Sequence, residues 1–515
     1  MKKGSFIYST FILIVVNFIV RFFGFAYRIL LSRMVGSEAI GLYHLVFPIL
    51  MLLITFASAG IPVAVSKLVA HYASLNMPSG CRKVLSISVV LGLIISSLLS
   101  LLLYLNGHFI AEKLIKNQDI YSGLMALIPA ILLIPLSSIV RGYYYGMKNV
   151  GPPGVSQILE QLFRIAFVIG ILTLFPPKTP KEAATIAILG ISIGEFAGLL
   201  WLVIAFKDIR IAYVKKTYHQ LTSPRDGLIS KIILIAAPIT ATRLVSVLIQ
   251  SINAALIPQR LVISGLSAQE AISTFGKLTG MAMPLLFLPF IVTSALVVNI
   301  IPSVAEEITL KHWHQLRMKC NLAIRMTLLV SIPLMALLIF YAEPLCLFLY
   351  QQEDVGTYLS FLGYGTVFLS LQHTLSGILH GMGKQVITTF NYLLGMGVQL
   401  VCTYYLVPNP SFRVNGFILG FLLSSILICT LNYICLNRFI QLKLRLFNDI
   451  GKPIFATIIM ILFLLNLNPL FLRFHLSPQM SMASSLLFSL LSFLILIFST
   501  GCISIRTIWY MLLKK

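Results

Sequence analysis

The chain has 515 residues, of which 58% are hydrophobic and only 10% are charged. Its mean hydropathy is +0.96, and a composition this poor in charge excludes an ordinary soluble domain of the same length. The 38 Lys and Arg residues against 15 Asp and Glu residues give a formal net charge of +23. Such an excess indicates either nucleic-acid binding or basic loops held on one side of a membrane.

Hydrophobic stretches follow one another along the whole chain, each long enough to cross a bilayer as a helix of about 20 residues. They are apolar throughout rather than alternating, which favours helices over a β-barrel. Their approximate cores are 6–31, 40–66, 84–105, 122–146, 154–175, 184–206, 229–256, 276–302, 320–341, 357–382, 386–407, 414–437, 454–472 and 482–505. The sequence therefore predicts an all-α polytopic membrane protein with about 14 transmembrane helices.

The location of the charges distinguishes the two explanations for the basic excess. If Lys2 and Lys3 lie in the cytoplasm, an even number of spans puts both termini there. The cytoplasmic loops then carry 23 Lys and Arg residues and 5 acidic residues. The outer loops carry 9 Lys and Arg residues and 8 acidic residues. The net charge is +18 inside, +1 outside and +4 within the spans. Most of the excess is thus explained by orientation, and the pattern argues against nucleic acid as a partner.

Two short matches suggest that the chain arose by duplication. Residues 141–147, Arg-Gly-Tyr-Tyr-Tyr-Gly-Met, match residues 376–382, Ser-Gly-Ile-Leu-His-Gly-Met, at an offset of 235. The pair Ile61-Pro62 also recurs as Ile301-Pro302. Six spans separate the copies, so they keep one orientation in the bilayer and form a parallel pseudo-two-fold repeat. The predicted parts are an N-lobe (1–206), a basic cytoplasmic linker (207–228), a C-lobe (229–437) and two additional spans (438–515).

Polar side chains inside three spans recur every three or four residues, so that each span presents one polar face. A charge at the membrane centre is costly and normally faces a cavity or a partner. The three stripes are Asn17, Arg21, Gly24 and Arg28; Gln157, Glu160, Gln161 and Arg164; and Arg243, Ser246, Gln250 and Asn253. Arg21 and Arg243, at similar depth in their spans, are expected to line a central cavity.

Two other interpretations apply to part of this set. Glu160 and Arg164 are spaced i,i+4 and can simply neutralise each other. Arg28, Arg141 and Arg325 lie nearer the ends of their spans, so their side chains can extend to the membrane interface. Glu195, near the middle of the sixth span, is a candidate proton or cation site, and it can equally form a hydrogen bond to a neighbouring residue.

Signals for an enzyme or a metal protein are missing from the sequence. The seven cysteines are scattered without a CxxC pair, which predicts neither a disulfide framework nor a metal site. No phosphate-binding or nucleophile motif occurs, and no loop is long enough for a catalytic domain. We therefore expect a protein that is not an enzyme and has no bound cofactor.

The motifs as a whole resemble those of a known superfamily. Residues 21–36, Arg-Phe-Phe-Gly-Phe-Ala-Tyr-Arg-Ile-Leu-Leu-Ser-Arg-Met-Val-Gly, together with 141–147 and 156–164, are similar to the multidrug/oligosaccharidyl-lipid/polysaccharide (MOP) flippases. The closest resemblance is to the stage V sporulation protein B group. Lipid II flippases of this superfamily carry a related Arg-x-x-Gly-x-x-Arg element; Arg21 and Gly24 match it, and Arg28 is displaced by one residue.

This resemblance implies an alternating-access flippase in the bacterial cytoplasmic membrane. The cargo would be an undecaprenyl-pyrophosphate-linked saccharide, such as lipid II or a related polysaccharide unit for the spore cortex or cell envelope. The substrate residues would be Arg21, Arg28, Arg243, Asn17, Gln250 and Asn253, with Glu160, Gln161, Arg164 and Glu195 as cavity or ion-coupling residues. Transport would use Na⁺, H⁺ or the membrane potential, and cell-wall synthases are expected partners.

Two alternatives stay open at this point. A cation-coupled drug exporter of the multidrug and toxin extrusion type would use the same fold, with Glu160 and Glu195 as its acids. A scaffold for a cell-wall synthesis complex is the other, and the polar stripes argue against it.

Overall fold

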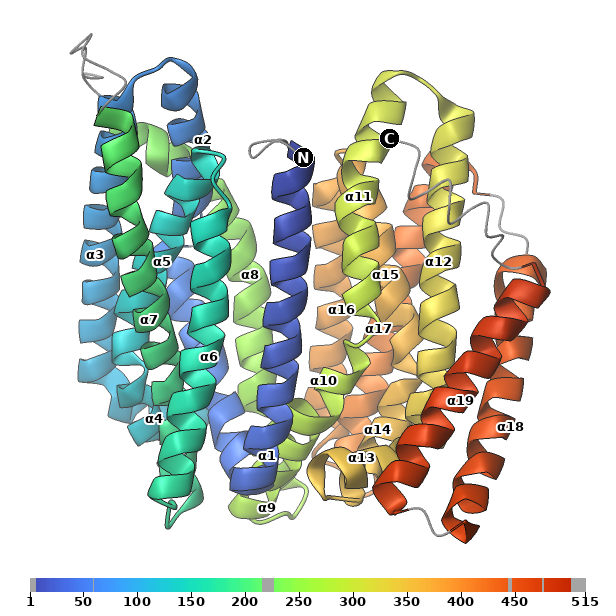
Figure 1. Ribbon diagram of the computed structural model, residues 1–515. Helices are drawn as coiled ribbons and strands as arrows, with labels where there is room; N and C mark the ends of the chain where they lie inside the picture. The colour runs from blue at the N-terminus through green and yellow to red at the C-terminus, as the bar shows by residue number, and fades with distance from the viewer. Residues whose placement is uncertain (1–5, 59, 215–226, 443–446, 475–476, 502–515) are drawn as a thin grey trace. The chain divides into compact units, whose positions relative to one another are not determined.

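The computed structural model describes residues 6–58, 60–214, 227–442, 447–474 and 477–501, and every regular element within these ranges is a helix. The predicted all-α fold is therefore confirmed. Contacts group the chain into two units, Met1–Gly280 and Met281–Lys515. Figure 1 shows the helices of each unit running roughly side by side. Most of the predicted linker, 215–226, lies outside the described residues, and so do Lys2, Lys3, Lys443 and Arg445.

Unit 1 is built from nine α-helices and one π-helical segment among its described residues. They are α1 (Phe6–Ser58), α2 (Ile61–Ser74), α3 (Pro78–Phe109), η1 (Ile110–Ile115), α4 (Ile120–Ala126), α5 (Ile128–Gly146), α6 (Gly151–Leu174), α7 (Pro180–Val214), α8 (Leu228–Ile263) and α9 (Ala268–Gly276).

The remaining elements begin with η2 (Lys277–Ala282), which crosses the boundary between the units. Unit 2 continues with α10 (Met283–Leu286), α11 (Phe290–Thr309), α12 (Trp313–Phe340), α13 (Ala342–Tyr350), α14 (Asp354–Gly363), α15 (Gly365–Gly381), α16 (Gln385–Leu406), α17 (Val414–Ile440), η3 (Phe447–Gly451), α18 (Lys452–Arg473) and α19 (Pro478–Ser499).

Twelve described helices are long and apolar enough to cross a membrane. The difference from the predicted number has two physical origins. The first two expected spans form one continuous element because α1 turns at Gly36 (φ 76°) without a helix-free loop. The tenth expected span contains α14 and α15, which are 10 and 17 residues long. The count of 14 spans stays a prediction, while the multi-pass helical architecture is confirmed.

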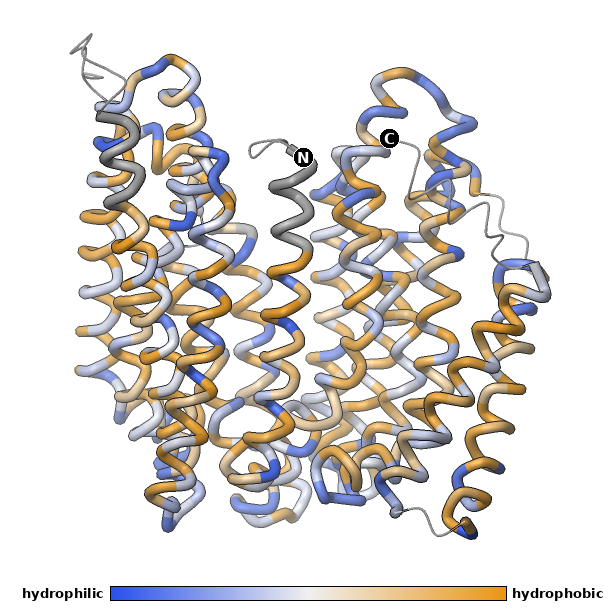
Figure 2. The backbone as a smooth tube through the Cα atoms, in the orientation of Figure 1, coloured by the Kyte–Doolittle hydropathy of each residue, from blue (hydrophilic) through white to orange (hydrophobic). Residues whose placement is uncertain are grey.

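Hydrophilic residues gather toward the ends of the helices and the loops, and the middle parts are mostly apolar (Figure 2). This distribution is what a bilayer requires, because a helix satisfies its own backbone hydrogen bonds in hydrocarbon. Helices then associate through small residues that allow a close approach. On α3 the buried stripe Ser88, Gly92, Ser96 and Ser100 provides such a surface, and a Cβ atom at Gly92 would lie 2.6 Å from the Ile139 side chain of α5.

A repeated glycine contact supports the predicted duplication. In unit 1, a Cβ atom at Gly142 would lie 2.5 Å from the carbonyl oxygen of Pro62. In unit 2, a Cβ atom at Gly377 would lie 2.7 Å from the Val297 side chain. The first contact joins α5 to α2, and the second joins α15 to α11. Each residue of the second contact lies 235 positions after its counterpart in the first.

The next turn of the same helices repeats the relation. Gly146 packs against Ser66 and Val69, and Gly381 packs against Ile301 and Val304. Ile301 therefore corresponds to Ser66, and the predicted equivalence of Ile301-Pro302 with Ile61-Pro62 was wrong. A two-residue match carries too little information to fix a register, whereas a packing contact does so directly. The lobe boundaries derived from the repeat stay a prediction.

The two C-terminal helices, α18 and α19, pack against each other, and α18 also packs against α12. The Nε atom of Arg325 on α12 lies 3.6 Å from Oδ1 of Asp449 in η3. Lys452 Nζ donates to the carbonyl oxygen of Thr500 at 2.8 Å. The Arg325 contact thus attaches the additional spans to α12, whereas the Lys452 hydrogen bond joins α18 to the end of α19. Arg325 is paired with a carboxylate and does not extend to the membrane interface as expected.

Candidate functional site

The first predicted stripe lies on α1 with its polar side chains exposed. Asn17, Arg21 and Arg28 are all exposed, whereas Tyr27, beside Arg28, is buried. The helix thus packs one side into unit 1 and leaves the guanidinium groups accessible along a membrane-spanning segment.

The stripe on α8 is similar. Arg243 and Gln250 are exposed, and Asn253 is buried at 6% exposure. The helix starts at Leu228 and places Arg243 about 15 residues, or about 22 Å, from its beginning. Arg243 is therefore far from either end of α8, where an arginine could reach the interface.

Two contacts fix the position of α8, one with Gly60 at the start of α2 and one with the second half of α1. At one level a Cβ atom on Gly60 would overlap the backbone of Ala236. Farther along, Ser251 Oγ lies 3.3 Å from the carbonyl oxygen of Pro48 and can donate to it. Arg243 lies between these two contacts. The helices that carry Arg21, Arg28 and Arg243 therefore belong to one unit, while the binding roles of these residues stay a prediction.

The third stripe takes part in a different arrangement, a buried cluster of four charges on α5, α6 and α7. Arg164 Nη2 lies 2.7 Å from Glu160 Oε1. Arg141 Nη2 lies 3.0 Å from Glu160 Oε2 and 3.6 Å from Glu195 Oε2. The four side chains are 7–16% exposed. Two guanidinium groups and two carboxylates thus form a cluster with no formal net charge.

Hydroxyl groups complete the cluster. Ser137 Oγ donates to Glu195 Oε2 at 2.5 Å. Arg141 Nη2 donates to Ser156 Oγ at 3.3 Å, and Ser156 Oγ in turn donates to the carbonyl oxygen of Gly198 at 3.0 Å. The network therefore ties α5 to both α6 and α7.

Several buried polar atoms beside the cluster have no hydrogen-bond partner among the described residues. Buried donors and acceptors of this kind are rare in protein interiors, and they indicate water, an ion or a ligand. They are Arg141 Nε, Arg164 Nε, Gln161 Oε1, Tyr27 Oη and Ser192 Oγ. The cluster is a candidate site for a small polar species for this reason.

The cluster changes the interpretation of Arg141. Its place near the end of a span predicted an interfacial side chain, and that expectation was wrong. Arg141 turns inward because two carboxylates on neighbouring helices, Glu160 and Glu195, compensate its charge where a lone guanidinium would be costly. Sequence distance hides this pairing, since Glu160 lies 19 and Glu195 lies 54 residues away. The expected i,i+4 pair between Glu160 and Arg164 is confirmed.

The second copy of these helices has the same packing without the charges. The offset of 235 places Ser376, Gly395 and Gln399 at the positions of Arg141, Glu160 and Arg164. Gly190 on α7 lies near the carbonyl oxygen of Arg164, and Gly420 on α17 lies near that of Gln399, the counterpart of Arg164. Gly420 is therefore the counterpart of Gly190, so the offset between α7 and α17 is 230 residues. Ser425 then corresponds to Glu195. The fold therefore does not require the charges, and comparison of the two copies is the signal that would have identified Arg141 from the sequence.

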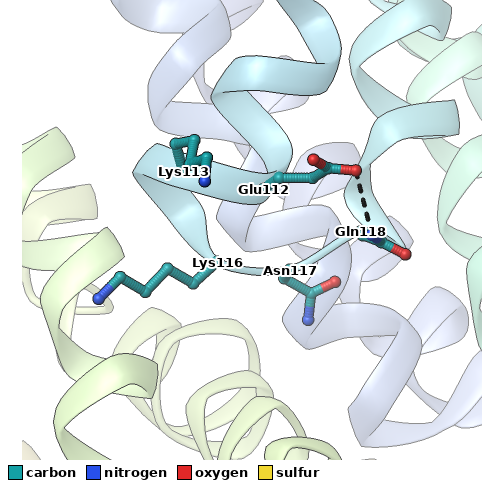
Figure 3. A pocket seen from close by; sticks show the side chains of 5 residues that line it. All are labelled: Glu112, Lys113, Lys116, Asn117 and Gln118. Atoms are coloured by element: carbon teal, nitrogen blue, oxygen red, sulfur yellow. Dashed lines mark hydrogen bonds between the residues drawn. The ribbon is translucent and has the colours of Figure 1, made fainter.

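A surface pocket of about 480 Å³ lies at the end of α3, lined by Glu112, Lys113, Lys116, Asn117 and Gln118 (Figure 3). Gln118 Nε2 donates to Glu112 Oε1 at 3.0 Å. The two lysine side chains extend in different directions and do not converge on the opening. None of the predicted site residues lines this pocket.

Long apolar helices, buried intramembrane charge pairs and exposed intramembrane arginines define a multi-pass membrane transporter. The fold agrees with this class. An inward-facing multidrug resistance transporter of the MOP superfamily superposes with a TM-score of 0.68 at 16% identity, over 81% of this chain and 94% of that one. A MOP superfamily transporter from Pyrococcus furiosus, described as having a binding pocket of reverse polarity, gives 0.57 at 15% identity, over 84% and 94%.

The chain belongs to the polysaccharide biosynthesis protein family, whose model matches residues 6–307. A MatE model also matches residues 238–405. Stage V sporulation protein B of Bacillus subtilis is 26% identical over 446 residues, 87% of this chain and 86% of the relative. Lipid II flippase MurJ of the same organism is 26% identical over 453 residues, 84% and 82%. The resemblance to MOP flippases inferred from the motifs is confirmed.

Proposed function

We propose that this protein is a flippase that moves an undecaprenyl-pyrophosphate-linked saccharide from the inner to the outer leaflet of the bacterial cytoplasmic membrane. The cargo is lipid II or a related unit for the spore cortex or cell envelope. Both termini lie in the cytoplasm, and the protein is a transporter rather than an enzyme. Its family and its similarity to a protein named lipid II flippase support the class of cargo.

One observation carries the proposal: the intramembrane arginines divide into a group paired with carboxylates in the interior and a group exposed on the helix surface. Arg141 and Arg164 are buried with Glu160 and Glu195, and Arg325 lies beside Asp449. Arg21, Arg28 and Arg243 are exposed on α1 and α8. The exposed guanidinium groups among these arginines therefore lie on two helices of one unit.

Guanidinium groups are well suited to a pyrophosphate. Their planar donors bind phosphate oxygens in pairs, and the attraction gains strength where water is scarce. An arginine facing lipid at mid-span would cost at least about 2.5–3.5 kcal/mol, so exposure of Arg21 and Arg243 favours a polar transport route. Asn17, Gln250 and Asn253 would hydrogen-bond the saccharide, while the lipid tail stays in the bilayer.

The membrane potential acts in the same direction. Moving an anion outward across an inside-negative membrane is favourable by about 2.3 kcal/mol per charge per 100 mV. The buried cluster would couple transport to an ion gradient, because binding of Na⁺ or H⁺ at Glu160 or Glu195 would change the net charge of the cluster. Gln161 and Arg164 lie next to these carboxylates on α6 and would take part in the same step. Cell-wall synthases would act on the saccharide after it reaches the outer leaflet.

The test is reconstitution of the full chain in liposomes with fluorescent lipid II, an undecaprenyl-pyrophosphate disaccharide and an undecaprenyl-monophosphate sugar. We expect protein-dependent translocation of the pyrophosphate cargoes and slower movement of the monophosphate. Failure to move any undecaprenyl-linked saccharide, with the protein correctly inserted, would contradict the proposal.

A cation-coupled drug exporter is the second candidate, favoured by the shared fold. It would need accessible acids to bind a cationic drug, yet Glu160 and Glu195 are both buried and paired with arginine. Drug-efflux measurements in a sensitised host separate the two functions, since the flippase should confer no resistance.

A further inference from the structure

Two basic side chains lie at the end of unit 2 where α16 begins and α17 ends. The two helices pack along each other (Figure 1), and Asn391 Nδ2 on α16 donates to Asn432 Oδ1 on α17 at 2.9 Å. Lys384 directly precedes α16, and Arg438 lies in the last turn of α17. We call Lys384, Arg438 and Phe439 the basic end.

Lys384 is held in place by its backbone and by its side chain. The turn from α15 to α16 passes through Gly383 (φ 72°), in the left-handed region that glycine adopts without strain. The backbone N–H of Lys384 donates to the carbonyl oxygen of Leu379 at 2.9 Å. Its Nζ atom lies 4.9 Å from the centroid of the Phe439 ring, a distance at which the ring attracts a cation. The ammonium group is thus positioned beside α17 by the protein itself.

The charges of the basic end are not balanced by acids. Among the described residues, neither Lys384 nor Arg438 forms an ion pair with a carboxylate. This differs from Arg325 in the same unit, which lies beside Asp449. Arg438 is exposed and Lys384 is half-buried. An anionic group from outside the protein can therefore interact with both bases.

An exposed apolar stripe runs along α16 away from the basic end. Val386, Phe390 and Leu394 recur every four residues and are 82%, 60% and 44% exposed. The stripe is about 12 Å long, close to half of the hydrocarbon core of a bilayer, which is about 30 Å thick. On α17, Ile434 lies one turn before Arg438 and is 43% exposed. Both helices therefore carry a base at the end of a surface that suits an acyl chain.

The packing of these helices does not require the bases. The repeat relates α16 to α6 by 235 residues and α17 to α7 by 230, so Asn149 corresponds to Lys384 and Asp208 corresponds to Arg438. The first copy forms the same helix pair with an amide and a carboxylic acid at these positions. This difference between the copies indicates that the bases serve binding rather than folding.

We propose that the basic end binds the headgroup of an anionic phospholipid, such as phosphatidylglycerol, with an acyl chain along the stripe on α16. The guanidinium group binds phosphate oxygens in pairs, and the ammonium group adds a second positive charge. Each base near a membrane surface strengthens the binding of an anionic lipid by about fivefold, so two bases give about 25-fold. The site lies in unit 2 and is distinct from Arg21, Arg28 and Arg243 of unit 1.

Native mass spectrometry of the full chain in detergent tests the preference. Phosphatidylglycerol and phosphatidylcholine with the same acyl chains are titrated separately, and we expect tighter binding of phosphatidylglycerol. Lys384→Gln with Arg438→Gln should weaken its binding by about 25-fold. The control, Lys113→Gln with Lys116→Gln, removes two exposed bases from another part of the chain and should retain the affinity. Equal affinity for the two lipids, or unchanged affinity in the first variant, would overturn the proposal.

A second measurement reports on the stripe itself. Val386→Trp, in a chain whose native tryptophans are replaced by phenylalanine, is placed in liposomes that contain brominated phosphatidylglycerol or brominated phosphatidylcholine. We expect stronger quenching of tryptophan fluorescence by the brominated phosphatidylglycerol, and loss of the difference when Lys384→Gln and Arg438→Gln are added. Equal quenching by the two lipids in the chain that keeps both bases would overturn the proposal.

Glycerol phosphate separates a phospholipid from a soluble anion, because it carries the phosphate without the acyl chains. It should leave the quenching by brominated phosphatidylglycerol unchanged, and displacement of the lipid by glycerol phosphate would overturn the assignment to a phospholipid. No saccharide is present in these experiments. Their outcome is therefore independent of whether the protein moves lipid-linked saccharides.

Discussion

Glu160 is the residue on which the buried cluster depends, because it is shared by two guanidinium groups. Its Oε1 accepts from Arg164 and its Oε2 from Arg141. Burying such charges is costly, and the cost is offset only while each partner is present. The cluster therefore stabilises the packing of α5, α6 and α7 only while each of its charged side chains keeps its partner.

Glu160→Gln should leave two buried guanidinium groups with one carboxylate. Removing one partner of a buried pair typically costs about 3–5 kcal/mol, so we expect a clear fall in the midpoint of thermal unfolding in detergent. Glu306→Gln, at an exposed position, is the control and should unfold like the unsubstituted protein. An unchanged midpoint for Glu160→Gln would show that the carboxylate does not hold the cluster.

Sequence reasoning reached this site only in part. The i,i+4 spacing of Glu160 and Arg164 predicts their contact, because one helix fixes the geometry. The partners of Arg141 lie on two other helices, and nothing in hydropathy indicates which faces of α5, α6 and α7 meet. The stripes on α1 and α8 were visible as periodic polar residues, whereas their exposure depends on packing.

At the scale of helices, most boundaries were predictable because apolar length marks them. The expected core 154–175 corresponds to α6, Gly151–Leu174, and 386–407 corresponds to α16, Gln385–Leu406. The expected span 276–302 is instead divided among η2, α10 and α11. Pro284 and Pro289 interrupt the helical backbone there, yet they scarcely change the mean hydropathy, so an apolar window does not reveal the breaks.

Two helical glycines provide a matched test of the packing argument. Gly142→Ala on α5 would place a Cβ atom 2.5 Å from the carbonyl oxygen of Pro62, and overpacking of this kind typically costs about 1–3 kcal/mol. Gly170→Ala on α6 meets nothing within 4 Å and should stabilise the helix by about 0.5–1 kcal/mol. Unfolding midpoints that shift in the same direction would contradict the close contact of α5 with α2.

At the scale of the whole molecule, the sequence predicts an orientation from its basic loops. In a chain without native cysteines, Lys113→Cys at the outer end of α3 should react with an impermeant maleimide in intact cells. Lys311→Cys, between α11 and α12, should react only after the cells are permeabilised. Both positions are exposed, so reactivity reports the side of the membrane. The reverse pattern would invert the topology and the direction of transport.

The most direct measurement of the central claim is translocation of fluorescent lipid II by proteoliposomes that contain Arg21→Ala or Arg243→Ala, beside the unsubstituted protein. The control is Arg33→Ala, which removes an exposed arginine from the same helix α1 nearer its turn. We predict that Arg21→Ala and Arg243→Ala abolish translocation while insertion and folding persist, and that Arg33→Ala retains it. Full translocation by Arg21→Ala and Arg243→Ala would contradict the account.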